Sequence, residues 1–251
     1  WSTNRNYFDE ACRLVRENIC QYIELYALPD TFDEYAQLWQ TISIPYVIHA
    51  PHFMHGMNLA DNNKRKTNVV LAEEAFKFAD LLKANYVIFH PGVAGKDEET
   101  IYQLSNFPKN WKPKILIENK PYRTIDEPPL ICNGHSPKSV AEIIKETSVG
   151  FCFDIGHCIC SANSRCLESF IEITEYEKLN PTIYHLSDND IYSPIDGHKH
   201  FGEGNYDFEK ILRLIDLSKP ISLETTKIYT DSLADFCNDI NYIEHITNII
   251  S

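Results

Sequence analysis

The sequence predicts an α/β fold, specifically a TIM (β/α)8 barrel, and three observations support that prediction. Short apolar runs of strand length alternate about eight times with segments of helical period. The runs are too uniformly apolar to have one solvent-facing side, which is typical of parallel strands covered by helices. The 251 residues are the usual size of such a barrel. Residues 1–251 are therefore expected to form one domain. A doubly wound open sheet is the runner-up, and no glycine fingerprint supports it.

The predicted elements alternate along the chain. Residues 1–3 are expected to be the tail of a truncated first strand. The other strands are predicted at residues 20–28, 45–49, 86–90, 115–118, 150–154, 182–186 and 221–224. Helices are predicted at residues 4–19, 31–40, 71–82, 96–107, 137–144, 208–215 and 233–250, with a cysteine-containing helix after residue 154. The helix at 96–107 is expected to be short or irregular, because its period is weak. Residues 187–205 have no period and are rich in Gly, Asp and His, which indicates a functional loop.

Composition limits the classes of function. A formal net charge of -13 argues against binding nucleic acid through a general basic surface. No run approaches the roughly 18 apolar residues that cross a bilayer, and no signal sequence is visible, so no membrane partner is expected. The eight cysteines form no CxxC pair, which favours a reducing cytoplasm and buried structural thiols. The chain begins at Trp1 without Met, so we expect that a few native residues or a processed leader precede it.

Six of the predicted strands end on a residue type that binds metals, and none of the six ends on Lys, Arg, Ser or Thr. These residues are His49, His90, Glu118, Asp154, His185 and Glu224. Since the carboxyl ends of all barrel strands meet at one face, we expect these side chains to surround a single pocket. A buried carboxylate without a partner is costly, which favours a metal site over six unrelated polar residues.

Three further candidates bring the predicted ligand set to nine. They are His157, on the turn after Asp154, and the DxH pair Asp196 and His198. Nine His, Asp and Glu ligands suit two or three ions of zinc, with manganese or iron as alternatives, and one bridging carboxylate. Clusters of this kind chiefly bind phosphate esters and activate water. The remaining histidines are expected to be structural or to support the ligands: His52, His55, His135, His200 and His245.

An ordered series of motifs resembles a known family. HAPHFMHGMNL, FHPG, LIEN, FDIGHC, HLSDND, DGHKHFGEGN and LET resemble AP endonuclease family 2, the endonuclease IV-like proteins among the xylose isomerase-like TIM barrels. The resemblance implies three zinc sites: His49, His90 and Glu118; Glu118, Asp154, His185 and Glu224; His157, Asp196 and His198. It also implies that Glu118 bridges two ions, and that Glu118, Asp154 and Glu224 are catalytic. A metal-activated hydroxide would attack the phosphodiester 5′ to an abasic site in DNA.

The sequence departs from the DNA-cleaving members at three places. Gly197 stands where their DxH pair usually encloses an Arg, and the loop at residues 52–57 is longer than theirs and holds two His. The loops also carry few cations for a duplex binder. The cations available are Lys64, Arg65, Lys66, Lys120, Arg123, Lys199 and Lys227. The substrate is thus expected to be abasic DNA or a smaller phosphorylated or sugar compound.

Two other functions remain as alternatives. A sugar isomerase or epimerase of the same superfamily would use one divalent metal and the Glu118 and Glu224 pair. Such an enzyme has no use for His49, His90 and the DxH pair as ligands, so these residues discriminate. A metal-loaded binding protein without catalysis is the third alternative, and it does not require open coordination positions.

Overall fold

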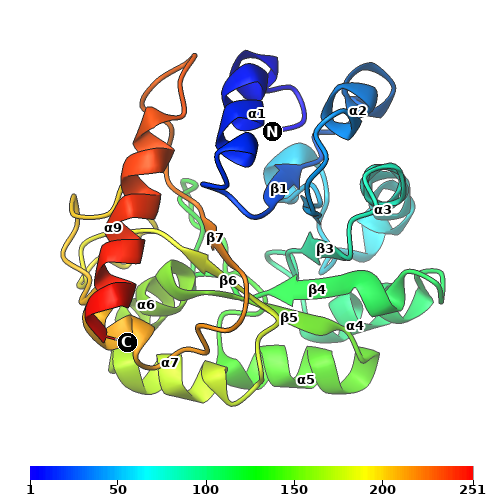
Figure 1. Ribbon diagram of the computed structural model, residues 1–251. Helices are drawn as coiled ribbons and strands as arrows, with labels where there is room; N and C mark the ends of the chain where they lie inside the picture. The colour runs from blue at the N-terminus through cyan, green and yellow to red at the C-terminus, as the bar shows by residue number, and fades with distance from the viewer. Residues whose placement is uncertain (251) are drawn as a thin grey trace. The chain divides into compact units, whose positions relative to one another are not determined.

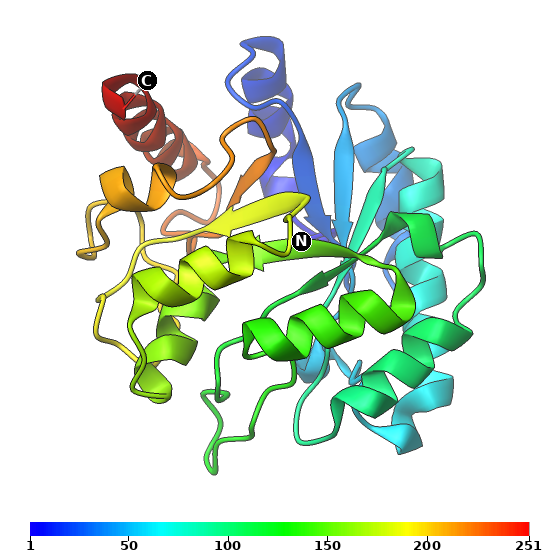
Figure 2. The ribbon, with the colours of Figure 1, turned by 90° about the horizontal axis from the view of Figure 1, so that it is seen from below.

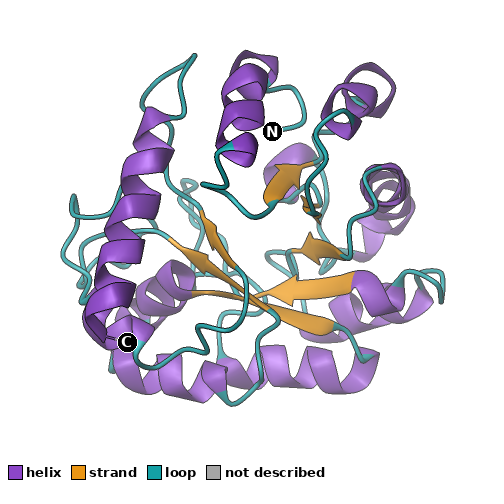
Figure 3. Cartoon of the chain, in the orientation of Figure 1, coloured by secondary structure: helices purple, strands orange, loops and turns teal. Residues whose placement is uncertain are grey.

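The computed structural model describes residues 1–250, and the chain divides into two compact units. Unit 1 consists of Trp1–Ile117 and Ile143–Gly150, and unit 2 of Glu118–Glu142 and Phe151–Ser251. Strands alternate with helices in both units (Figure 3). No helix within residues 1–250 is both long enough and apolar enough to cross a membrane.

Unit 1 contains parallel strands that pair in the order of the chain (Figure 2). They are β1 (Ile23–Tyr26), β2 (Tyr46–His49), β3 (Tyr86–Phe89) and β4 (Ile115–Glu118), whose last residue belongs to unit 2. All four lie at predicted positions. Residues 1–3 form no strand, but the Ser2 amide donates to the Tyr26 carbonyl at 2.8 Å. The start of the chain therefore lies beside the end of β1, and residues 1–250 contain seven strands rather than eight.

The helices of unit 1 are amphipathic and bury one face. The α-helices are α1 (Phe8–Arg16), α2 (Phe32–Gln40), α3 (Arg65–Leu81) and α4 (Asp97–Asn106) (Figure 1). The 3-10 turns are η1 (Arg5–Tyr7), η2 (Phe53–His55), η3 (Asn62–Lys64) and η4 (Lys112–Lys114). Helix α3 packs on β2 and β3 and buries Leu71, Ala75 and Phe78.

A short or irregular helix was expected at residues 96–107, and the helix found there is short but regular. Helix α4 is a regular helix of 10 residues. Its first turn carries Asp97, Glu98 and Glu99, which complement the positive end of the helix dipole. Thr100, Gln103 and Leu104 are buried. Two of these three are polar, so a pattern that counts only apolar residues underestimates the buried face.

Unit 2 contains three neighbouring parallel strands, β5 (Gly150–Asp154), β6 (Ile183–Leu186) and β7 (Ile221–Leu223). Its helices are α6 (Ile155–Ser164), α7 (Ser169–Glu177), α8 (Phe208–Leu212) and α9 (Ala234–Ile250), while α5 (Pro137–Thr147) has residues in both units. Helix α6 packs on α7 and β6, and α8 packs on α9. The predicted cap of α5 is confirmed, since the Ser139 amide donates to Ser136 Oγ at 3.2 Å.

Strand β5 shows how the local sequence aims a polar side chain. Phe151 and Phe153 stack on Tyr176 of α7, with ring centroids 5.8 and 5.1 Å away. Successive side chains of a strand point to opposite faces, so Cys152 and Asp154 point away from α7. The aromatic packing of α7 thus fixes the direction of the Asp154 carboxylate.

Candidate metal centre

Four predicted ligands of unit 2 lie at the carboxyl ends of its strands. Glu118 ends β4, Asp154 ends β5, His185 lies on β6, and Glu224 follows β7 directly. The strand register places Asp154 opposite His185. Glu118 and His185 are completely buried, and Asp154 is 2% exposed. Parallel strands bring their carboxyl ends to one edge, so the sequence pattern becomes a cluster of side chains in this unit.

The first group of side chains, which we call the glutamate group, consists of Glu118, His185 and Glu224. His185 Nδ1 lies 3.0 Å from Glu224 Oε1 and 3.7 Å from Glu118 Oε2. Cys152 Sγ, two residues before the end of β5, lies within 4.8 Å of ligand atoms of Glu118 and His185. The imidazole of His185 therefore sits between two carboxylates, each with an oxygen directed at it.

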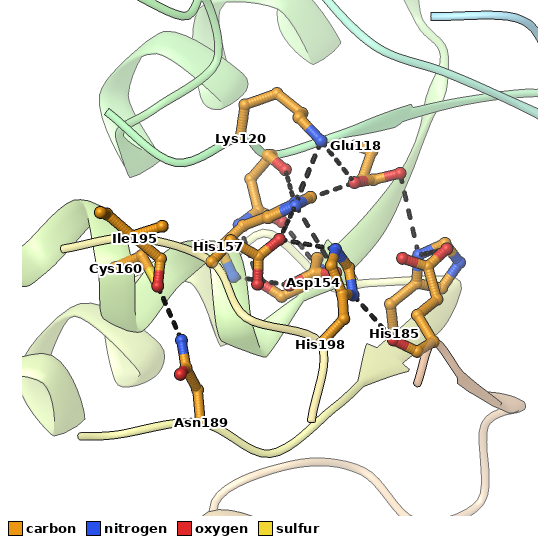
Figure 4. Close-up of polar contacts among 12 residues, drawn as sticks. Glu118, Lys120, Asp154, His157, Cys160, His185, Asn189, Ile195 and His198 are labelled. Carbon is orange, nitrogen blue, oxygen red and sulfur yellow. Dashed lines mark hydrogen bonds and ion pairs between the residues drawn. The ribbon is translucent and has the colours of Figure 1, made fainter. Parts of the chain in front are cut away.

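The second group, which we call the aspartate group, consists of His157, Asp196 and His198. Asp196 Oδ2 lies 3.0 Å from His157 Nε2 and 2.7 Å from His198 Nε2. The other ring nitrogen of His198, Nδ1, lies 2.7 Å from the Glu224 carbonyl, to which it donates. That hydrogen bond leaves Nε2 of His198 as the nitrogen that could bind a metal ion, in the manner usual for metal-binding histidines. Figure 4 shows His157 next to Lys120 and Glu118, and the rings of His157 and His198 have centroids 6.0 Å apart.

Asn119 connects the strand ends and orients His157. Its side chain donates to the Asp154 carbonyl and accepts from the Asp154 amide, both at 2.8 Å. Asp154 caps helix α6 by accepting from the His157 amide at 2.6 Å. His157 Nδ1 lies 3.0 Å from the Asn119 carbonyl. His157 is thus positioned by backbone contacts at both its amide and its ring.

A buried carboxylate, that of Asp188, helps to hold the loop that carries Asp196 and His198. Asp188, 1% exposed, accepts from the backbone amides of Gly202 and Gly204 at 2.9 and 3.0 Å and of Tyr206 at 3.2 Å. A Cβ on Gly204 would lie 2.2 Å from the Asn189 carbonyl oxygen, so only glycine fits there. The irregular sequence therefore folds into a fixed loop around Asp188.

The charged groups of the cluster and their burial shift the pKa values of the cluster residues. Burial raises the pKa of the Asp154 carboxyl to about 6, although His157 acts in the opposite direction. Burial alone would lower the pKa of His157, but Asp154 and Asp196 raise it to about 10. In the same way Asp196 overcomes burial and raises the pKa of His198 to about 9. Burial disfavours a charged Asp196, yet the two histidines hold its pKa well below its usual range.

The donor set fits divalent cations. Unit 2 gathers four buried or half-buried carboxylates, from Glu118, Asp154, Asp196 and Glu224, around three imidazoles and one ammonium, that of Lys120. An imidazole that binds a metal is neutral, so with the histidines as ligands the four carboxylates leave an excess of negative charge, which is costly to bury unless cations balance it. His nitrogens together with carboxylate oxygens suit zinc and its neighbours rather than magnesium. These side chains meet the requirements of a site for more than one ion.

The histidines of unit 1 lie close together. The rings of His49 and His90 have centroids 4.9 Å apart, and Tyr26 stacks on His49 at 5.2 Å. His55, expected to be structural, has Nδ1 2.7 Å from the Tyr26 hydroxyl, and the His52 amide donates to the same hydroxyl at 2.9 Å. The assignment of His49 and His90 to an ion shared with Glu118 stays a prediction.

Two features of unit 2 were not predicted from the sequence. Lys120 was counted among the loop cations, but its side chain is 14% exposed and contacts Glu118. The spacing of two residues from Glu118 is the signal, because an extended chain directs both side chains to one face. His200 contacts Asp239 of α9 at 2.7 Å, and no local pattern connects residues so far apart.

Comparisons with known proteins show the family of the chain. Residues 12–240 match the family model described as xylose isomerase-like TIM barrel. A probable endonuclease 4 of Aquifex aeolicus is 26% identical over 206 residues, 73% of this chain and 71% of the relative.

Two solved structures have a similar fold. Endonuclease IV of Thermus thermophilus has a TM-score of 0.67 at 17% identity, covering 98% of this chain and 96% of that one. A D-tagatose 3-epimerase-like protein has a TM-score of 0.73 at 22% identity, covering 95% and 92%. The names of these two proteins refer to enzymes of two classes, epimerases and endonucleases. The predicted fold class and the resemblance are confirmed by the family match, and the chain belongs to the xylose isomerase-like TIM barrel family.

Proposed function

We propose that this protein is a zinc-dependent phosphoesterase that hydrolyses the phosphodiester 5′ to an abasic site in DNA. The observation that carries the proposal is the aspartate group, His157, Asp196 and His198, in the same unit as the glutamate group. One divalent ion would not require both groups, whereas phosphoester hydrolysis commonly uses several ions. The 26% identity to a probable endonuclease 4 supports the same reaction.

The side chains of unit 2 would have different roles in the proposed hydrolysis. Bound divalent ions would supply Lewis-acid polarisation of the phosphate ester and activation of water at neutral pH. Glu118, His185 and Glu224 would hold one ion, and the aspartate group another. Asp154 positions His157 through the cap of α6. The Lys120 ammonium places a fixed positive charge beside the cluster, which favours an anionic substrate group.

Cleavage of a duplex oligonucleotide that carries a tetrahydrofuran abasic analogue tests the proposal. The zinc-loaded wild type is expected to cut the strand 5′ to the analogue, and Glu118→Ala and His198→Ala to lose the activity. Exposed residues provide matched controls, Glu146→Ala and His245→Ala, which are expected to cut at the wild-type rate. An intact substrate after incubation with fully loaded wild type would rule out the DNA repair assignment.

A second candidate, a sugar isomerase or epimerase, is favoured by the arrangement of the glutamate group. Glu118 and Glu224 both direct an oxygen at His185, the arrangement that a one-metal proton shuttle between adjacent carbons would use. The metal content discriminates between the candidates. Protein prepared without chelator is expected to contain two to three zinc equivalents per chain by elemental analysis. A value of one would favour the isomerase, since that enzyme leaves the aspartate group empty.

A further inference from the structure

Lys120 lies inside the cluster of carboxylates and imidazoles. Its Nζ is 3.3 Å from Glu118 Oε1, 3.2 Å from His157 Nε2 and 3.4 Å from His157 Nδ1 (Figure 4). Its side chain is 14% exposed, compared with 0% for Glu118 and 4% for His157. The ammonium is therefore a built-in part of the cluster and not a surface charge.

The position of Lys120 overlaps a group that could hold a metal ion. Glu118, Asp154 and His157 each offer one ligand atom, and these atoms lie within 4.8 Å of one another. The ammonium lies 3.3 Å from Glu118 Oε1 and 3.4 Å from His157 Nδ1, the His157 nitrogen that faces Glu118 and Asp154. An ion in this group would sit about 2 Å from its ligand atoms, and so within a few ångströms of Nζ. Two positive charges so close repel strongly in a buried site.

The hydrogen bonds of His157 point to the same conclusion. Its Nδ1 lies 3.0 Å from the Asn119 carbonyl and 2.9 Å from Glu118 Oε1, and both oxygens are hydrogen-bond acceptors for an Nδ1 that carries a proton. A nitrogen that carries this proton is not a ligand. Nε2 lies 3.0 Å from Asp196 Oδ2 and is left for the aspartate group. His157 thus serves only one of the two metal groups in which it takes part.

We propose that the Lys120 ammonium takes the place of a divalent cation among Glu118, Asp154 and His157, so that unit 2 binds ions only in the glutamate group and the aspartate group. This inference rests on the metal-binding part of the proposed function and is independent of the phosphoester step. The tethered ammonium balances the Glu118 carboxylate whether or not metal is bound.

Metal binding by Lys120→Met tests the inference. Methionine keeps most of the length and volume of the side chain and removes its charge. With His157 Nδ1 engaged by Asn119, the carboxylates of Glu118 and Asp154 would hold the added ion. The variant is expected to bind one more equivalent of Zn²⁺ or Co²⁺ per chain than the wild type in equilibrium dialysis, or to bind its weakest equivalent at least tenfold more tightly. Lys120→Arg, which keeps the charge, is expected to show no gain. Lys138→Met removes an exposed positive charge of unit 2 and is expected to match the wild type.

Stability measurements keep the test decisive if the metal-free variant folds poorly. Zinc is then expected to raise the Tm of Lys120→Met by more than it raises the Tm of the wild type. Equal or lower metal content and an equal or smaller zinc-induced rise in Lys120→Met would overturn the inference. The proposed function is tested by a separate experiment, the cleavage of abasic duplex by the wild type, so its failure is distinguishable from failure of this inference.

Discussion

Asp196→Ala is expected to remove one equivalent of bound metal and to lower phosphoesterase activity by at least about 100-fold. Asp196 Oδ2 lies within 3.0 Å of both imidazoles of the aspartate group, so its loss removes the only carboxylate among these three residues. Loss of a residue that merely supports a ligand already costs roughly 10- to 100-fold in affinity or activity, and a direct ligand should cost more. Elemental analysis and the rate of abasic-duplex cleavage measure the two effects.

Two variants make the Asp196 experiment specific. Asp196→Asn keeps the shape of the side chain and removes its charge, so it should lose the metal equivalent without disturbing the loop. Asp231→Ala removes an exposed aspartate from unit 2 and should retain full metal content. Unchanged metal content in both Asp196 variants would show that the aspartate group binds no ion, and would leave the glutamate group as the basis for a one-metal enzyme.

The strand ends were predictable because their signal is local. An apolar run that stops at a carboxylate or an imidazole fixes both a buried strand and its polar end, as β4 and β5 show with Glu118 and Asp154. Parallel pairing then places such ends at one edge. The local pattern and the topology together therefore predict that Glu118, His185 and Glu224, the glutamate group, lie close to one another. The DxH pair was predicted from its residue types, although the loop around it has no period.

The rest depends on contacts that no local pattern encodes. The spacing from Glu118 directs the Lys120 side chain to the same face, but the other carboxylates around its ammonium, those of Asp154 and Asp196, come from a separate strand and a loop. Helix α4 is regular because polar Thr100 and Gln103 are buried: Thr100 Oγ1 donates to the Pro91 carbonyl and the Gln103 side chain donates to the Leu59 carbonyl. The pattern of hydrophobic residues does not reveal a buried helix face whose polar side chains donate hydrogen bonds to backbone carbonyls of other segments.

A buried network anchors the loop next to the aspartate group. Asp239 of α9, 2% exposed, accepts from His200 Nδ1 at 2.7 Å, from the Thr225 hydroxyl at 2.6 Å and from the Phe201 amide at 3.1 Å. Asp235, one turn earlier on α9, accepts from Lys227 Nζ at 2.8 Å. Helix α9 therefore holds both the residues after His198 and those after Glu224.

Asp239→Ala is expected to lower the free energy of unfolding by about 3 to 5 kcal/mol, because it leaves His200, Thr225 and a backbone amide buried without their acceptor. Urea denaturation measures the loss as a lower midpoint at unchanged slope. Glu244→Ala, at an exposed position of α9, should change stability by less than about 0.5 kcal/mol. A loss below about 1 kcal/mol in Asp239→Ala would mean that water replaces the carboxylate, and that the loop carrying His198 is held by Asp188 alone.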